Sequence, residues 1–258
     1  MTQRIHPTVL VDPSAIIADD VEIGPFSIVG PDVTIGRGSC IEARVTLDRN
    51  VRLGEQVRVG TGSIIGGPPQ DLKYAGEVSW VEIGDGTHIH ECTTINRGTE
   101  ASGVTRVGRN CLIMTFVHLA HDCHIGDSVI ISNGTQLAGH VTIEDHVVVS
   151  GIVGVHQFVR LGAYSFIGGM TKVSQDIPPF VKANGNPAEL YGLNTVGLQR
   201  HKFSAETVAA LKRAYRLCFN SDLKLSQALE RARTEVPAIP EVVRFLEFVS
   251  SSERGFPA

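Results

Sequence analysis

An aliphatic residue recurs at every sixth position of this sequence, in one frame that runs from Ile5 to Val173. The frame holds 29 positions, and 26 of them are Ile, Val or Leu; the exceptions are Asp71, Glu77 and Ala101. An α-helix repeats about every 3.6 residues and a strand about every 2, so neither produces this period. A strict hexapeptide period is typical of a parallel β-helix, in which each hexad forms a short strand and a turn.

A second inward position is expected four residues after each frame position, and it is small or β-branched. Its occupants include Ala15, Val21, Ser27, Ser39, Val45, Ser63, Thr93, Cys123, Val129, Thr135, Ser165 and Thr171. A large aliphatic side chain within each wall and a small one near each corner fit a narrow triangular core. Three hexads then form one coil, so residues 18 apart stack at roughly 4.8 Å, the spacing between strands.

Two stretches interrupt the period without shifting its frame. Residues 66–82 and 96–106 contain Gly, Pro and charged residues where core residues are expected. We therefore predict two loops that leave the prism, each replacing whole hexads. Because functional residues concentrate on loops held by a rigid scaffold, both loops are candidates for a functional site.

The period ends after Val173, and the remaining chain has a helical pattern. Ser204 is a suitable N-cap with Glu206 in the first turn, which predicts a helix that ends near Phe219. Two further helices are expected near 222–235 and 240–250. We accordingly divide the chain into a β-helical domain over 1–183 and a helical domain over 184–258. This tail would cap the open end of the prism.

The tail also has an excess of positive charge. Over residues 200–216 a single acidic residue, Glu206, stands against five basic ones: Arg200, Lys202, Lys212, Arg213 and Arg216. Such a cluster is either a solvated face or a docking patch for an acidic partner, and the pattern leaves both open.

Composition excludes several classes of function. A net charge of −4 argues against a general nucleic-acid binder. The five cysteines form no CxxC pair, and Cys111 and Cys123 lie at small inward positions, which favours core packing over redox or metal chemistry. No signal peptide is visible and the longest uncharged run, about 146–159, is too short to span a bilayer, so a cytoplasmic protein is expected.

Six of the ten histidines fall in one short stretch, and the coil arithmetic brings them together. They are His118, His121, His124, His140, His146 and His156. His121, Gly139 and Gln157 are separated by 18 residues each, so we expect them to stack on one wall in consecutive coils. His140 and His156 would flank this column, and His118 would lie near the corner that leads into it.

Two chemistries could use such a cluster. One is zinc hydration of the γ-carbonic anhydrase type, but two ligands of that family are separated by four residues, a spacing that no histidine pair here has. The other is acyl transfer to a hydroxyl, with a histidine as general base and a backbone amide as the oxyanion donor. His121 beside Gly139 satisfies both requirements of acyl transfer, since glycine permits a close approach.

Several motifs resemble one family closely. They are PPQDLKYAG (68–76), TINRGT (94–99), AHDC (120–123), LAGHV (137–141), VHQF (155–158), GNPAELYGLN (185–194) and GLQR (197–200). Together they are similar to the UDP-N-acetylglucosamine acyltransferases, and the resemblance covers the whole chain. It implies a left-handed parallel β-helix with a C-terminal helical domain, and a homotrimer with its site between neighbouring prisms. Outward apolar residues that would need such cover are Ile28, Ile130, Val148, Phe158 and Phe166.

The resemblance also implies an activity: transfer of a (3R)-hydroxyacyl group from acyl carrier protein to the 3-hydroxyl of UDP-N-acetylglucosamine, the first step of lipid A biosynthesis. No cofactor or metal is implied beyond the phosphopantetheine that carries the acyl group. His121 would be the general base, Asp122 the carboxylate that orients it, and Gly139 the oxyanion donor. Substrate contacts would come from Gln70, Asp71, Lys73, His118, His140, His156, Gln157, Gly169, Asn194 and Arg200. Acyl carrier protein, which is acidic, would meet Lys212, Arg213 and Arg216.

Some positions depart from the family pattern. Val196 and His201 stand where some members have Glu and Arg, and Asn96 replaces a histidine of some members. Gly169 matches the position that limits acyl length, and a glycine leaves the cleft open, so a chain of about twelve to fourteen carbons is expected.

Other functions remain as alternatives. The N-acyltransferase that acts later in the same pathway has an additional N-terminal domain, for which hexads beginning at Ile5 leave no room. A coenzyme A-dependent acetyltransferase, a zinc enzyme or a non-catalytic scaffold would share the hexads. The motifs do not distinguish UDP-N-acetylglucosamine from its 3-amino analogue as acceptor.

Overall fold

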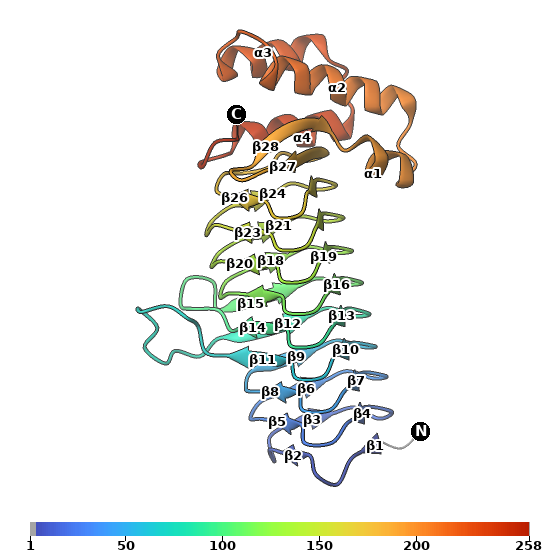
Figure 1. The fold of residues 1–258 in the computed structure, drawn as a ribbon, viewed down its shortest axis with the longest axis vertical. Helices are drawn as coiled ribbons and strands as arrows, with labels where there is room; N and C mark the ends of the chain where they lie inside the picture. Colours follow the sequence, from blue (N-terminus) through green and yellow to red (C-terminus); the bar gives the residue numbers. More distant parts are fainter. Residues whose placement is uncertain (1–3, 258) are drawn as a thin grey trace.

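The computed structural model describes residues 4–257, which form a three-sided prism of short strands with helices stacked on its C-terminal end (Figure 1). Each side of the prism is one sheet, and successive strands of the chain move from one sheet to the next. The prism strands pair in parallel, as the hexapeptide period predicts. The fold is a left-handed parallel β-helix followed by a helical tail.

Sheet A contains eleven strands and continues from the prism into the tail. Its last two members are antiparallel, which ends the coil. The strands, in order, are β1 Arg4–Ile5, β4 Glu22–Ile23, β7 Cys40–Ile41, β10 Arg58–Val59, β13 His88–Ile89, β16 Leu112–Ile113, β19 Ile130–Ile131, β22 Val148–Val149, β25 Phe166–Ile167, β27 Val181–Asn184 and β28 Glu189–Leu193.

Sheets B and C form the other two sides, with nine and eight strands. Sheet B consists of β2 Leu10–Val11, β5 Ile28–Val29, β8 Thr46–Leu47, β11 Ile64–Gly67, β14 Thr94–Asn96, β17 His118–Leu119, β20 Gln136–Leu137, β23 Gly154–Val155 and β26 Lys172–Val173. Sheet C consists of β3 Ile16–Ile17, β6 Thr34–Ile35, β9 Val51–Leu53, β12 Trp80–Ile83, β15 Val104–Val107, β18 His124–Ile125, β21 Thr142–Ile143 and β24 Arg160–Leu161.

The strand register shows how the two loops fit into the coil. Partners are 18 residues apart where the period is unbroken, as for Arg106 and His124. Arg52 and Glu82 are 30 apart, and Glu82 and Arg106 are 24 apart. The first loop therefore inserts two hexads and the second inserts one, which confirms the prediction of whole-hexad loops. Both loops project from the same side of the prism, between β11 and β12 and between β14 and β15 (Figure 1).

The aliphatic frame residues form the core of the prism, as predicted, except near its N-terminal end, where Val11 is 41 % exposed. Ile65, Leu119 and Leu137 are each 0 % exposed, and the three exceptions to the period lie in the loops. Some small inward residues near the corners satisfy backbone groups. The Ser27 hydroxyl, for example, donates to the Glu42 carbonyl at 2.8 Å and accepts from the Val45 amide. The Ser27 hydroxyl is therefore tolerated inside the prism because it both donates and accepts a hydrogen bond.

The helical tail follows the prediction, with two elements that it missed, the strand β28 and the first helix. Its helices are α1 Thr195–Arg200, α2 Ala205–Phe219, α3 Leu225–Glu235 and α4 Pro240–Ser250, and α1 was not expected. The Ser204 side chain caps α2 by accepting from the Thr207 amide, as expected. Their apolar faces form a second core around Phe180, Leu211 and Phe245. Among the residues that the structure describes, no helix has the length and apolar character needed to span a bilayer.

Candidate active site

The predicted histidine column exists, but it lies in turns at one corner of the prism and not on a wall. His121 occupies the turn between β17 and β18, and the His121 carbonyl accepts from the His140 amide in the turn above. The Gly139 carbonyl accepts in the same way from Phe158. Two-residue strands place the third hexad position past the end of the strand, which is why a wall position was the wrong expectation. We call this edge the B/C corner, because it joins sheets B and C.

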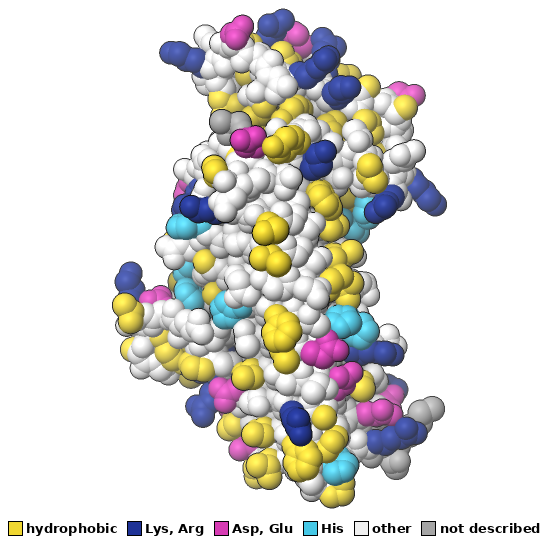
Figure 2. Space-filling view, in the orientation of Figure 1, with side chains coloured by type: hydrophobic (Ala, Val, Ile, Leu, Met, Phe, Trp, Pro, Cys, Tyr) yellow, Lys and Arg dark blue, Asp and Glu magenta, His cyan; other side chains and the backbone are white. Residues whose placement is uncertain are grey.

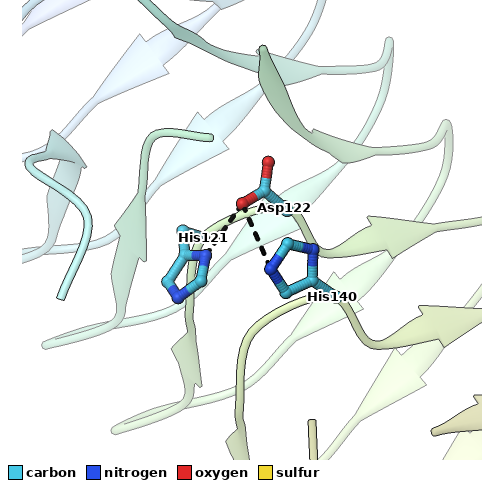
Figure 3. Close-up of side chains that lie close together, drawn as sticks. All are labelled: His121, Asp122 and His140. Atoms are coloured by element: carbon cyan, nitrogen blue, oxygen red, sulfur yellow. Dashed lines mark hydrogen bonds and ion pairs between the residues drawn. The ribbon is translucent and has the colours of Figure 1, made fainter. Parts of the chain in front are cut away.

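His121 and Asp122 form a buried pair at this corner. His121 Nδ1 lies 2.8 Å from Asp122 Oδ2, and the two residues are 8 % and 1 % exposed (Figure 3). In an extended strand, adjacent side chains point to opposite faces and could not meet. Asp122 instead has a φ of +60°, a left-handed turn conformation that directs its carboxylate toward the neighbouring ring.

The second loop supplies most of the remaining partners of the Asp122 carboxylate. The Thr99 amide donates to Oδ1 at 3.0 Å and the Thr99 hydroxyl donates to Oδ2 at 2.8 Å, while the Ser102 hydroxyl donates to Oδ1. Burial alone would raise the pKa of Asp122, but the hydrogen bonds from Ser102, His121 and Thr99 outweigh it and lower this pKa to about 2. The carboxylate is therefore ionised at neutral pH although it is inside the protein.

An ionised carboxylate assigns the tautomer of His121. Because a carboxylate only accepts hydrogen bonds, the proton between the two groups resides on His121 Nδ1. In the neutral ring Nε2 then has a free lone pair. This arrangement is the one that a general base requires.

Gly139 lies directly against the His121 ring. A Cβ atom added to Gly139 would come within 2.5 Å of His121 Cε1 and 2.7 Å of His121 Nε2. Only glycine therefore fits beside this ring, which brings the Gly139 backbone next to Nε2. Within residues 4–257 the Gly139 amide has no hydrogen-bond acceptor, so it is free to donate to a ligand.

His140 packs against the pair from the next coil. Its ring meets the His121 ring edge-on, with centroids 5.1 Å apart, and stacks on Phe158 at 4.6 Å. His140 Nε2 is 3.7 Å from the same Asp122 Oδ2 (Figure 3). Burial lowers the pKa of His140, and the nearby His121 adds to this effect while Asp122 opposes it. His140 is thus held as a neutral ring near neutral pH.

A groove of about 540 Å³ runs along sheet B beside His121. Predicted site residues that line it are Gln70, His118, His121, Gly139, His156 and Gln157. His118 lies on β17 within the wall, not near the corner as expected, and its Nδ1 is 2.7 Å from the Thr94 hydroxyl. Burial and His121 lower the pKa of His118.

A second cavity of about 530 Å³ lies on the other side of the pair, under the first loop. Asp71, Lys73, His140 and Phe158 line it. His140 therefore faces a different space from His118 and His156, although all three were expected to contact substrate. The Asp71 carboxylate accepts from the Lys73 amide at 2.9 Å, a local turn that shapes the loop.

Two predicted substrate residues lie on another side of the prism. Asn194 and Arg200 line a cavity of about 500 Å³ over sheet A, together with His146, Tyr164 and His201. Asn194 caps α1, since its Oδ1 accepts from the Gly197 amide at 3.1 Å and its Nδ2 donates to the Tyr164 carbonyl at 3.0 Å. Within one chain this cavity and the His121 groove are separate.

The other predicted residues are also apart from His121. Gly169 is exposed in the turn after β25, at the corner that joins sheets A and B. An added Cβ at Gly169 would come no nearer than 3.4 Å to the Gly151 carbonyl, so the space beside it is open. Lys212, Arg213 and Arg216 are exposed on α2, and Lys and Arg side chains gather at this end of the molecule (Figure 2).

The donor set at the B/C corner could in principle hold a metal ion. His121, Asp122 and His140 have ligand atoms within 4.8 Å of one another, the one such trio among residues 4–257. However, the Asp122 oxygens already accept hydrogen bonds from Thr99, Ser102 and His121. A metal ion would have to replace several of these bonds, so the arrangement suits a histidine–carboxylate pair better than a ligand set.

Sequence reasoning missed the residues that hold Asp122. Thr99 and Ser102 belong to the second loop, which the interrupted period identifies, and Thr99 ends the motif TINRGT. Nothing in the hexad spacing shows that this loop folds back onto Asp122. The buried Arg97, which is 5 % exposed, was also missed.

Known proteins of one family are similar to this chain along nearly its whole length. A family model described as Udp N-acetylglucosamine O-acyltransferase, domain 2, matches residues 176–256, and one described as bacterial transferase hexapeptide (six repeats) matches 14–49 and 105–139. The acyl-[acyl-carrier-protein]–UDP-N-acetylglucosamine O-acyltransferase of Burkholderia orbicola is 49 % identical over 257 residues, covering 98 % of both chains. The enzyme of the same description from Thiobacillus denitrificans is 48 % identical over 252 residues, covering 97 % of this chain and 98 % of the relative.

Solved structures show the same similarity. A UDP-N-acetylglucosamine acyltransferase from Bacteroides fragilis superposes with a TM-score of 0.96 at 40 % identity, covering 98 % of this chain and 99 % of that chain. The Arabidopsis UDP-N-acetylglucosamine acyltransferase superposes with a TM-score of 0.87 at 34 % identity, covering 98 % and 99 % of the two chains.

Proposed function

The chain belongs to the family of acyl carrier protein-dependent UDP-N-acetylglucosamine O-acyltransferases, and we propose that it carries out this reaction with His121 as the general base. The reaction moves a (3R)-hydroxyacyl group from acyl carrier protein to the 3-hydroxyl of UDP-N-acetylglucosamine, the first step of lipid A biosynthesis. The observation that carries the mechanism is the position of His121, with Nδ1 on the buried Asp122 carboxylate and Nε2 beside Gly139.

His121 Nε2 removes the proton of the sugar hydroxyl as its oxygen attacks the thioester carbonyl carbon. Asp122 stabilises the imidazolium that forms, because its carboxylate is ionised and accepts from Nδ1. The carbon–sulfur bond then breaks, and the thiolate of the phosphopantetheine takes the proton back from His121. One acyl–oxygen bond replaces one acyl–sulfur bond, and His121 returns to its neutral form.

Gly139 provides the donor for the oxyanion of the tetrahedral intermediate. Its amide adjoins the His121 ring and has no acceptor of its own within the described residues. A donor already aimed at the position where charge develops stabilises the transition state more than the ground state.

The nucleotide sugar and the acyl chain occupy the cavities on sheets A and B. Lys73 suits the diphosphate as a point charge, and Gln70 and Asp71 share its loop. Because Asn194 and Arg200 lie over sheet A while His121 faces sheet B, one chain alone does not assemble these residues. A homotrimer in which sheet A of one copy faces sheet B of the next would join them.

Apolar outward residues support such an assembly. Ile130, Val148 and Phe166 follow one another on sheet A and would be covered by a neighbouring copy. Gly169, at the A/B corner, leaves room in this interface for an acyl chain of about twelve to fourteen carbons. The exposed basic residues of α2 form the surface that binds the acidic acyl carrier protein. The proposed location of the enzyme is the cytoplasm.

The mechanism is tested by assaying His121→Ala with hydroxyacyl-acyl carrier protein and UDP-N-acetylglucosamine, with and without a chelator. We expect kcat to fall on the order of 10²- to 10⁴-fold in the variant, and wild-type activity to survive the chelator. His90→Ala is a matched control, since His90 lies on the other side of the coil after β13. Near-full activity of His121→Ala, or loss of wild-type activity with the chelator, would contradict the mechanism. The same assay with the 3-amino analogue identifies the preferred acceptor.

A further inference from the structure

We propose that Thr99 and Ser102, on the second extruded loop, are positioning residues that hold the Asp122 carboxylate in the orientation that keeps His121 Nε2 free for the substrate. Neither side chain lines the groove beside His121. Thr99 does line the second cavity, under the first loop, but its amide and its hydroxyl both donate to Asp122, so we place its effect, like that of Ser102, on Asp122. This inference rests on the proposed role of His121 as general base, and it adds the loop that controls that base.

The hydrogen bonds divide the two carboxylate oxygens between the loop and the histidine. Oδ1 accepts from the Thr99 amide and the Ser102 hydroxyl, whereas Oδ2 accepts from the Thr99 hydroxyl and His121 Nδ1. The loop therefore makes three of these four bonds. With Oδ1 held on the loop side, Oδ2 is the oxygen that faces both His121 and His140 (Figure 3).

The backbone of Asp122 is fixed as well. Its amide donates to the Thr105 hydroxyl at 2.8 Å, and Thr105 belongs to β15, directly after the loop. The loop and the strand that follows it thus hold the main chain and the side chain of one residue. Such an arrangement restrains both the left-handed turn and the carboxylate that depends on it.

The second loop is itself anchored by a buried arginine. The Arg97 guanidinium donates to Asp48 Oδ2 at 3.2 Å, to the Gly66 carbonyl, and to the Tyr74 hydroxyl at 3.2 Å. The Glu100 amide donates to Glu77, which lies on the first loop. The donors to Asp122 are therefore part of a hydrogen-bonded unit that restrains them, as a positioning role requires.

This unit also connects the two loops that interrupt the hexapeptide period. The first loop carries Gln70, Asp71 and Lys73, and it meets the second loop at Tyr74 and Glu77. If Thr99 and Ser102 had only a structural role, their substitution would change only the stability of these loops. A positioning role additionally affects the proton affinity of the His121–Asp122 pair, and this effect separates the two explanations.

Several other titratable groups face the pair. His118 acts on His121 from β17, and His140 acts on both residues from the coil above. His124 on β18 lies near Asp122, Arg106 on β15 acts on His124, and Asp71 acts on His140 from the first loop. None of these groups is changed by a substitution at Thr99 or Ser102, so a shift in the pH profile would report the loss of the hydroxyl donors.

The test uses Thr99→Val, Ser102→Ala and the double variant in the full chain, with steady-state kinetics across pH. Each single variant should lower kcat on the order of 10-fold and the double variant on the order of 100-fold, with little change in KM. Because each lost donor leaves more charge on the carboxylate, the acid limb of the kcat/KM profile should move to higher pH. Thr99→Ser and Ser102→Thr keep the hydroxyls and should restore both parameters.

Thr142→Val is the matched control, because it removes a hydroxyl from β21 on sheet C, away from the loop. Ser102 is exposed, so Ser102→Ala keeps the proposal testable even if Thr99→Val fails to fold. Wild-type kcat and an unchanged acid limb in Ser102→Ala and in the folded double variant would overturn the inference. An equal loss of kcat in the hydroxyl-retaining variants would overturn it too, since it would indicate a structural role.

The proposed function and this inference fail in different ways. If His121→Ala remains active, the general-base mechanism is wrong, whatever the loop variants do. If His121→Ala is inactive while the double loop variant behaves as wild type, the mechanism stands and only the positioning role is wrong.

Discussion

Two corners of the prism stack rings in the same way, yet within residues 4–257 only one of them holds a buried histidine–carboxylate pair. At the B/C corner His140 stacks on Phe158, and at the corner between sheets C and A His146 stacks on Tyr164 at 4.7 Å. All four residues have a φ near +60°, so the left-handed turn repeats in register and brings the side chains into columns. We call the second edge the C/A corner.

The difference between the corners comes from what covers them. The extruded loops cover the B/C corner, and Thr99 and Ser102 bring hydrogen-bond donors to Asp122. The tail covers the C/A corner, where His201 packs on His146 and Tyr164 with centroids 4.9 and 5.0 Å away. The same turn therefore holds a buried histidine–carboxylate pair under one cover and packed rings under the other.

Gly139→Ala should have the largest effect on the geometry of the B/C corner while leaving the side chains of His121 and Asp122 in place. The new Cβ would lie 2.5 Å from His121 Cε1, so the ring must move away from Asp122. A displacement of this kind should lower kcat on the order of 100-fold. Steady-state kinetics and a thermal melt measure the effect, and an active variant would show that the His121 ring position is not critical.

Acid unfolding should reveal the buried carboxylate at the B/C corner. The hydrogen bonds to Asp122 lower its pKa from 3.8 to about 2, so its contribution to stability is complete above pH 3.8. As the pH falls from 3.8 toward 2, roughly 2 kcal/mol should be lost. Urea unfolding of wild type and Asp122→Asn across this window measures the loss. A pH dependence that is equally steep in the variant would contradict the assignment.

Asn194→Ala probes the C/A corner, and the expected effect is smaller. It removes the cap of α1 and the hydrogen bond to the Tyr164 carbonyl, which should cost about 1 kcal/mol of folding stability. Because Asn194 lines the sheet A cavity, KM for the nucleotide sugar should rise while kcat changes little. Asn194→Asp retains the cap and should regain stability. A fall in kcat without a change in KM would place Asn194 in the chemical step instead.

The period of six predicted most of the fold because it reports burial directly. Nearly every aliphatic frame position ends a short strand, and the unbroken frame across 66–82 and 96–106 required loops of whole hexads. The prediction was wrong about which residues lie in the walls and which in the turns, since it placed His121 on a wall and His118 near a corner. The spacing of 18 gives the residues that stack, but not where each strand ends. The division of the chain at residue 183 stays a prediction.

The sequence by itself determined the repeating coil, the helices that follow it, and the column containing His121, Gly139 and Gln157, because these depend on local periodicity. Only the tertiary structure decided that Asp122 turns back to His121, that Thr99 and Ser102 hold its carboxylate, and that Asn194 lies over another sheet. These features depend on the path of the inserted loops and on a left-handed turn. The hexapeptide period predicts neither the loop path nor the turn. An insertion of whole hexads keeps the period in frame, whatever direction the side chains of the inserted loop take.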